Sequence, residues 1–138
     1  MSDNVKIFAT GNLHDVGQRE IGQAELDRYN VVIIKPIKDV AILNHIIASK
    51  VGSMNSETKE LLIKFYLNSW TKHEEARILA MSIRTFIEVA NIALEINKRK
   101  SAKLSVKEAL ELTYFGTSHA VINPNYARTY KEMIQELD

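Results

Sequence analysis

Three polar side chains in this sequence have the chemistry that is needed to read a phosphate group. Asn12 follows the apolar run 5–10, and Arg28 and Arg84 lie further along the chain. An amide at the end of a buried parallel strand faces the crevice where α/β proteins bind ligands, and there it can orient an attacking water. A guanidinium is planar and permanently charged, so it stabilises the charge that spreads over phosphoryl oxygens during nucleotide hydrolysis. The expected chemistry is therefore the positioning of charge and water.

Each of the three residues also has a plainer interpretation. Asn12 can simply cap the turn after a strand. Arg28 can pair with its neighbour Asp27 at the surface, where an ion pair contributes little. Arg84 can be an ordinary exposed helix arginine, which is the commonest fate of this residue type. Taken alone, Thr10-Gly11-Asn12 favours the plainer interpretation.

Two short apolar runs are predicted to be the strands that position these residues. Residues 5–10 and 31–34 are rich in β-forming side chains and are bounded by Gly11 and Pro36, as is typical of buried parallel strands. The polar stretch 11–23 is predicted to be a loop. A short helix is expected between the loop and the second strand.

From Pro36 onwards the sequence changes to helical periodicity. Asp39 is expected to cap a first helix, and Asn55 or Ser56 a second, which turns a corner at 70–73. A third helical stretch is expected from Glu74, with Ser82 restarting or capping it. Its apolar stripe is Ile83, Phe86, Ile87, Ala90 and Leu94.

Two further caps are predicted towards the C-terminus. Ser105 and Glu108 fit a capping box for a short helix over 106–114. Asn123-Pro124 is typical of a cap followed by Pro at the first helical position. The last helix is amphipathic, with one apolar face made of Tyr126, Tyr130, Met133, Ile134 and Leu137.

In this order the motifs resemble the C-terminal part of an AAA+ ATPase of the MoxR-like and midasin-like branch. Ala9-Thr10-Gly11-Asn12 is similar to the sensor 1 strand, and Asp27-Arg28-Tyr29 is similar to the Leu-Asp-Arg-Phe signature, with Tyr in place of Phe. Ser82-Ile83-Arg84 is similar to sensor 2, and 103–109 to the end of the family's lids. The resemblance covers roughly residues 5–115.

The resemblance implies a fold class and a division of labour. The implied fold is an α/β fragment, mostly helical: two parallel-type core strands, an α-helical lid and a C-terminal amphipathic helix. The implied domains are 1–36 for the end of the core, 37–115 for the lid and 116–138 for the last helix. Asn12 would position water or γ-phosphate, Arg28 would act on the neighbouring subunit's nucleotide, and Arg84 would bind the γ-phosphate of its own subunit. The implied function is ATP hydrolysis, with Mg²⁺, coupled to protein remodelling.

Two motifs of a complete ATPase do not occur in these 138 residues. A phosphate-binding loop reads G-x-x-x-x-G-K-S/T, and no glycine here is followed by Lys. The family's Asp-Glu pair for Mg²⁺ does not occur either. We therefore expect the chain alone neither to hydrolyse ATP nor to bind it tightly, and to need a missing N-terminal half or copies of itself as partners. It can be a fragment, one half of a split enzyme or a remnant with a new role.

The alternative is a non-catalytic helical interaction module or oligomerisation fragment, in which the strand edges pair with a partner or a second copy. In that case Asn12, Arg28 and Arg84 are inherited without function.

Composition excludes several other classes. The net charge of +1 favours neither nucleic acid nor a membrane surface as a partner, and the lack of cysteine excludes disulfides and Cys-metal sites. The basic run 98–100 is explained by the dipole at a helix C-terminus. The four histidines are scattered, so we expect no metal site. With no signal peptide and no apolar run near the ~20 residues of a membrane helix, a cytoplasmic protein is expected.

Overall fold

The computed structural model describes residues 6, 8, 28, 32, 34–115 and 123–138. Their contacts divide the chain into two compact units, Met1–Lys35 and Pro36–Asp138, and each is described by itself. Almost all the described residues belong to the second unit, which also contains Arg84.

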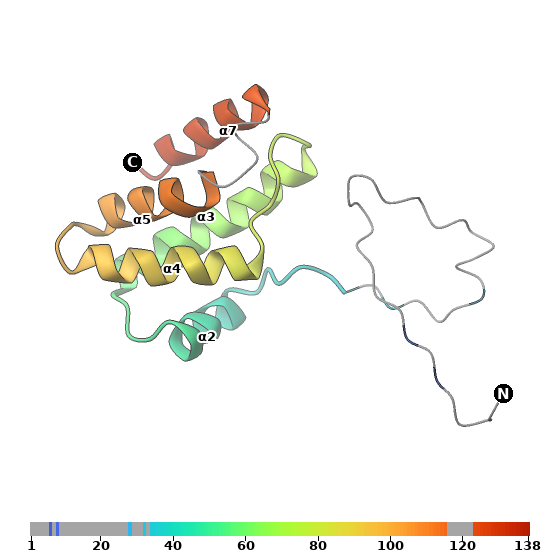
Figure 1. Ribbon diagram of the computed structural model, residues 1–138, viewed down its shortest axis with the longest axis horizontal. Coiled ribbons are helices and arrows are strands. Elements are labelled where there is room, and N and C mark those ends of the chain that lie inside the picture. The colour runs from blue at the N-terminus through green and yellow to red at the C-terminus, as the bar shows by residue number, and fades with distance from the viewer. Residues whose placement is uncertain (1–5, 7, 9–27, 29–31, 33, 116–122) are drawn as a thin grey trace. The chain divides into compact units, whose positions relative to one another are not determined.

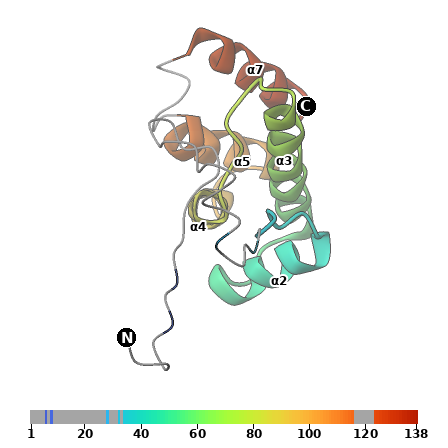
Figure 2. The same cartoon turned by 90° about the vertical axis from the view of Figure 1, so that its right-hand side faces the viewer.

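The second unit is a bundle of α-helices (Figure 1). Its elements in chain order are α2 (Val40–Lys50), α3 (Ser56–Glu74), α4 (Ile83–Asn97), α5 (Ala102–Leu110), the π-helical turn η1 (Glu111–Phe115) and α7 (Pro124–Gln135). Helix α5 packs mainly against α4 and also against α3. In both views of the bundle, α2 and α7 lie on opposite sides of it (Figures 1 and 2).

The prediction of an α/β fold is wrong, because the described residues contain helices and no strand. The described members of the two expected strands are Lys6 and Phe8 in the first and Val32 and Ile34 in the second, and none of them is in regular structure. Phe8, Val32 and Ile34 are also strongly exposed rather than buried in a sheet. The two apolar runs are short. A run of this length does not by itself distinguish a buried strand from other structure.

Two predicted helix boundaries are also wrong. The expected corner at 70–73 is helical, because α3 continues to Glu74, where a third helix had been expected to begin. The chain then turns at Ala76, whose positive φ of 56° ends the helix. Residues 75–82 form a loop, and α4 starts only after it.

Four of the predicted helix caps are confirmed and one is wrong. Asp39, Asn55, Ser82 and Asn123 all cap helices as predicted, each accepting a backbone N–H with its side chain. The capping box at Ser105 is wrong, since α5 begins earlier, at Ala102. Ser105 is buried inside that helix and its hydroxyl donates to the Ser101 carbonyl over 2.7 Å.

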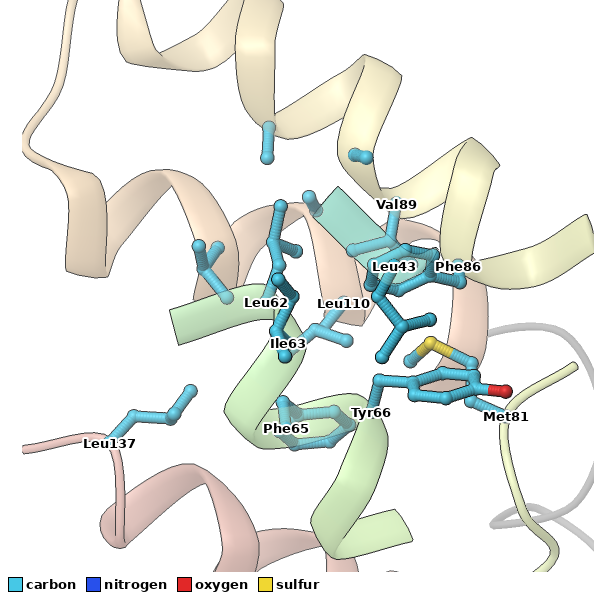
Figure 3. Close-up of a cluster of buried hydrophobic side chains, with 14 of the residues drawn as sticks. Leu43, Leu62, Ile63, Phe65, Tyr66, Met81, Phe86, Val89, Leu110 and Leu137 are labelled. Atoms are coloured by element: carbon cyan, nitrogen blue, oxygen red, sulfur yellow. The ribbon is translucent and has the colours of Figure 1, made fainter. Parts of the chain in front are cut away.

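The core lies between α3, α4 and α5 and is closed by side chains from α2 and α7 (Figure 3). The Tyr66 ring packs against Phe86 with centroids 5.0 Å apart, which joins the middle of α3 to the first turns of α4. The predicted apolar face of the last helix is confirmed: Tyr130, Met133 and Leu137 are buried, and the other members pack against the core. This core is what fixes the position of the α4 N-terminus.

A membrane span is not present in the described part of the chain, because none of its helices is both long and apolar enough.

Candidate functional site

Arg84 lies in the first turn of α4, two residues after the N-cap Ser82. The Ser82 hydroxyl accepts the Thr85 N–H over 3.1 Å, which satisfies one of the helix's free N-terminal donors. The Arg84 side chain is exposed. The sequence prediction of a capped helix with Arg84 one turn in is therefore confirmed, and it places a guanidinium at a helix N-terminus.

The charge of Arg84 has no internal partner. The first turn of α4 carries no acidic residue, and within the described residues Arg84 makes no ion pair. Arg77, which lies in the preceding loop, is different because it pairs with both Glu75 and Glu132. The positive end of a helix dipole disfavours a cation, by about 0.3–1 kcal/mol at an exposed site. The helix dipole therefore disfavours the charge of Arg84, and an anion bound at this end would offset that effect.

The residue before the N-cap of α4 is hydrogen-bonded to α3. The Met81 N–H donates to the Ser69 hydroxyl over 3.0 Å, and this hydroxyl donates in turn to the Tyr66 carbonyl over 2.6 Å. Both Met81 and Ser69 are buried, and Figure 3 shows Met81 beside Tyr66. The residue that precedes the Ser82 cap is thus anchored to α3, so the first turn of α4 is presented on a rigid support.

The loop before α4 has further anchors. The His73 Nδ1 lies 3.0 Å from the Ile78 carbonyl oxygen, and the Tyr114 hydroxyl donates to the Leu79 carbonyl. Burial raises the pKa of the Tyr114 hydroxyl, which therefore stays protonated as a donor. These bonds tie the loop to α3 and to the π-helical turn η1.

A cluster that the sequence analysis did not single out lies at the C-terminal half of α3. The Tyr66 hydroxyl and the Trp70 indole N–H are both buried and lie near each other, but neither makes a hydrogen bond of regular geometry with any described residue. The Lys38 ammonium lies 5.9 Å above the Trp70 ring and pairs with Glu74. Burial raises the pKa of Tyr66. No sequence pattern predicts this cluster, because Lys38 comes from a different segment of the chain.

The other two predicted site residues belong to the first unit of the chain, whereas Arg84 belongs to the second. Asn12 lies outside the described residues. Arg28 is described, in a turn and exposed, and belongs to the first unit. The roles of Asn12 and Arg84 on the nucleotide of their own subunit, and of Arg28 on that of a neighbouring subunit, therefore stay predictions.

The basic run at the other end of α4 is mostly neutralised. Lys98 pairs with Glu95 at 2.7 Å and Lys100 with Glu108 at 2.6 Å, and these residues line a shallow pocket beside Arg99. Cations at this end of a helix are favoured by the dipole. The pocket therefore has a structural explanation and offers little free charge to a ligand.

Metal binding finds no support in the part of the chain that the structure describes, since it holds no group of three or more His, Asp or Glu side chains placed for an ion.

No protein family, no curated protein and no solved structure matches this chain. The resemblance to AAA+ ATPases is therefore one of short sequence motifs alone.

Proposed function

We propose that residues 37–115 act as the helical lid of an AAA+-type ATPase of the MoxR-like and midasin-like branch, in which Arg84 binds the γ-phosphate of ATP. The observation that carries the proposal is the exposed, unpaired Arg84 at the positive end of α4. An anion supplied from elsewhere would relieve this unfavourable placement, and a nucleotide phosphate is such an anion.

The backbone at the same helix end supports an anion site. The Ser82 side chain satisfies the Thr85 N–H, but within the described residues the N–H groups of Ile83 and Arg84 donate to no protein acceptor. Free N-terminal N–H groups of this kind bind phosphate oxygens. The guanidinium adds charge-assisted hydrogen bonds to the same oxygens.

The remaining chemistry would come from other parts of the assembly. Because the sequence has neither a phosphate-binding loop nor an Asp-Glu pair, ATP and Mg²⁺ would be held mainly by a partner that carries both. Arg28 would act on the nucleotide of a neighbouring subunit, and Asn12 would position water. Closing of the lid on phosphate through Arg84 would couple the nucleotide state to remodelling of a protein substrate in the cytoplasm.

A reconstitution tests the proposal. If the gene immediately upstream encodes a phosphate-binding loop and an Asp-Glu strand, its product is mixed with this chain and ATP turnover is measured. We expect turnover only in the mixture. Arg84→Ala should lower kcat on the order of 10²-fold, as is typical when one donor to transition-state charge is removed. Arg28→Ala should lower it as well.

The matched control is Arg99→Ala, since Arg99 is an exposed arginine just beyond the opposite end of α4. It should leave turnover unchanged. Equal turnover of the Arg84→Ala, Arg28→Ala and unsubstituted mixtures would falsify the assignment of both arginines.

A further inference from the structure

Helix α2 exposes apolar side chains that the other described helices do not cover. Only Leu43 and Ile47 of its 11 residues are buried, while Val40 and Ile42 keep 50% and 48% of their surface exposed. The helix has no acidic residue, and its one charged residue, Lys50, is the last. Exposed apolar side chains on a helix that carries a single charge favour a binding partner for α2.

The exposed side chains form a seam of the kind that pairs with another helix. Ile42, His45, Ile46 and Ser49 recur at steps of three and four residues and so share one face. Ile42, His45 and Ser49 are exposed and Ile46 is half-buried at its edge. The seam is uncharged when His45 is neutral, so two copies of it can meet without like-charge repulsion.

The exposed side chain of Leu112 is not part of such a seam. Leu112, which is 63% exposed, lies next to Glu111 and one turn from Glu108. A single apolar residue among charges is ordinary protein surface. Leu112 therefore serves as a matched control for α2.

The charges at the two ends of α2 select the partner. Asp39 stands at the N-cap and Lys50 in the last turn, and neither forms an ion pair within the described residues. Asp39, Ile46 and Lys50 follow at steps of seven and four residues, so they lie along the same edge of the helix. When two copies of α2 pack antiparallel about a two-fold axis near His45, Asp39 of each copy faces Lys50 of the other.

We propose that α2 is a self-association surface on which a second copy of this chain packs antiparallel, α2 against α2, as an isologous dimer. The two helix dipoles then run in opposite directions, and the pairs of ends that meet carry opposite charges. Residues 42 and 49 of one copy lie opposite 49 and 42 of the other. This surface is separate from the proposed role of Arg84 on α4, so either proposal can fail alone.

The first test measures molar mass by light scattering from about 5 µM to about 500 µM, a range that covers weak homodimers. We expect the unsubstituted chain to move from the monomer mass towards twice that value. Ile42→Asp should keep the helical circular dichroism and weaken dimerisation by about tenfold or more, because it places two carboxylates in the seam. Leu112→Asp should dimerise like the unsubstituted chain.

The second test fixes the orientation by disulfide trapping, which is clean because the chain has no cysteine. Ile42→Cys and Ser49→Cys proteins are oxidised separately and as a mixture. The antiparallel arrangement predicts a cross-link between the two variants in the mixture and little cross-linking of either one alone.

A monomer at every concentration, as expected if another protein covers α2, overturns the proposal. Equal weakening by Ile42→Asp and Leu112→Asp overturns it too, and cross-linking of each cysteine variant with itself contradicts the antiparallel packing.

Discussion

The two ends of α4 both carry cations, but the protein treats them differently. Beyond the C-terminus, Lys98 and Lys100 have carboxylate partners and the favourable end of the dipole. At the N-terminus, Arg84 has no carboxylate partner among the described residues and lies at the unfavourable end of the dipole. A cation that the fold neutralises has a structural explanation. A cation that has no partner and lies at the positive end of the dipole needs a different explanation. This contrast is the basis of the binding role that we propose for Arg84, at the end with fewer positive charges.

Removing the support of α4 should have the largest effect, because it affects both ends at once. Phe86 is 1% exposed and packs against Tyr66. Phe86→Ala should lower the free energy of unfolding by about 3–5 kcal/mol, measured by urea denaturation. Ile87→Ala is the control, since Ile87 is half-buried and should cost much less. Similar losses for both would contradict the packing described for this face.

Removing an N-cap side chain should have different effects on stability at the two ends of α4. Ser82→Ala deletes the acceptor of the Thr85 N–H and should cost about 1 kcal/mol of unfolding free energy. Ser101 also stands at an N-cap position, that of α5 just beyond the C-terminus of α4, but its side chain makes no capping bond. Ser101→Ala should therefore change the melting temperature less than Ser82→Ala does. The reverse order would show that the Ser82 cap is not formed in solution.

The two arginines should have opposite effects on stability. Arg84→Ala removes a cation from the positive end of the dipole and should stabilise the fold by about 0.3–1 kcal/mol at low salt. Arg99→Ala removes one near the negative end and should destabilise by a similar amount. Urea titrations at low and high salt measure both, and salt should shrink the difference. Two changes of the same sign would remove the electrostatic argument.

The smallest effect concerns Lys38, a cation that has a partner outside α4. The Lys38 ammonium beside Glu74 holds the pKa of that carboxyl below its usual value. A lowered pKa in the folded state adds stability above the ordinary Glu pKa of about 4.3, and this stability is lost as the pH falls through the folded value. Glu74→Gln should flatten this part of a pH–stability curve slightly. An unchanged curve would mean that the pair is not formed in solution.

How far the sequence predicted the structure depended on whether the signal was local. Asp39, Asn55, Ser82 and Asn123 were predicted as caps because a cap needs only its own side chain and the next three residues. The cap predicted at Ser105 is wrong because the helix begins earlier, where Ala102 is buried, and burial is a tertiary effect.

The prediction of two strands is wrong for the same reason, which is that tertiary contacts decide the outcome. An apolar run forms a strand only beside a neighbouring strand. The candidate site was predicted only in part. The position of Arg84 followed from the Ser82 cap, while its lack of a partner and the Lys38–Trp70 contact required the folded chain.

The most direct test of the central claim is an amide chemical-shift titration of this chain with inorganic triphosphate, followed residue by residue along α4. We predict that the largest shifts occur at Ile83, Arg84 and Thr85, that Arg84→Ala abolishes them, and that Arg99→Ala leaves them unchanged. Shifts centred on residues 98–100, or first-turn shifts that persist in Arg84→Ala, would contradict the account.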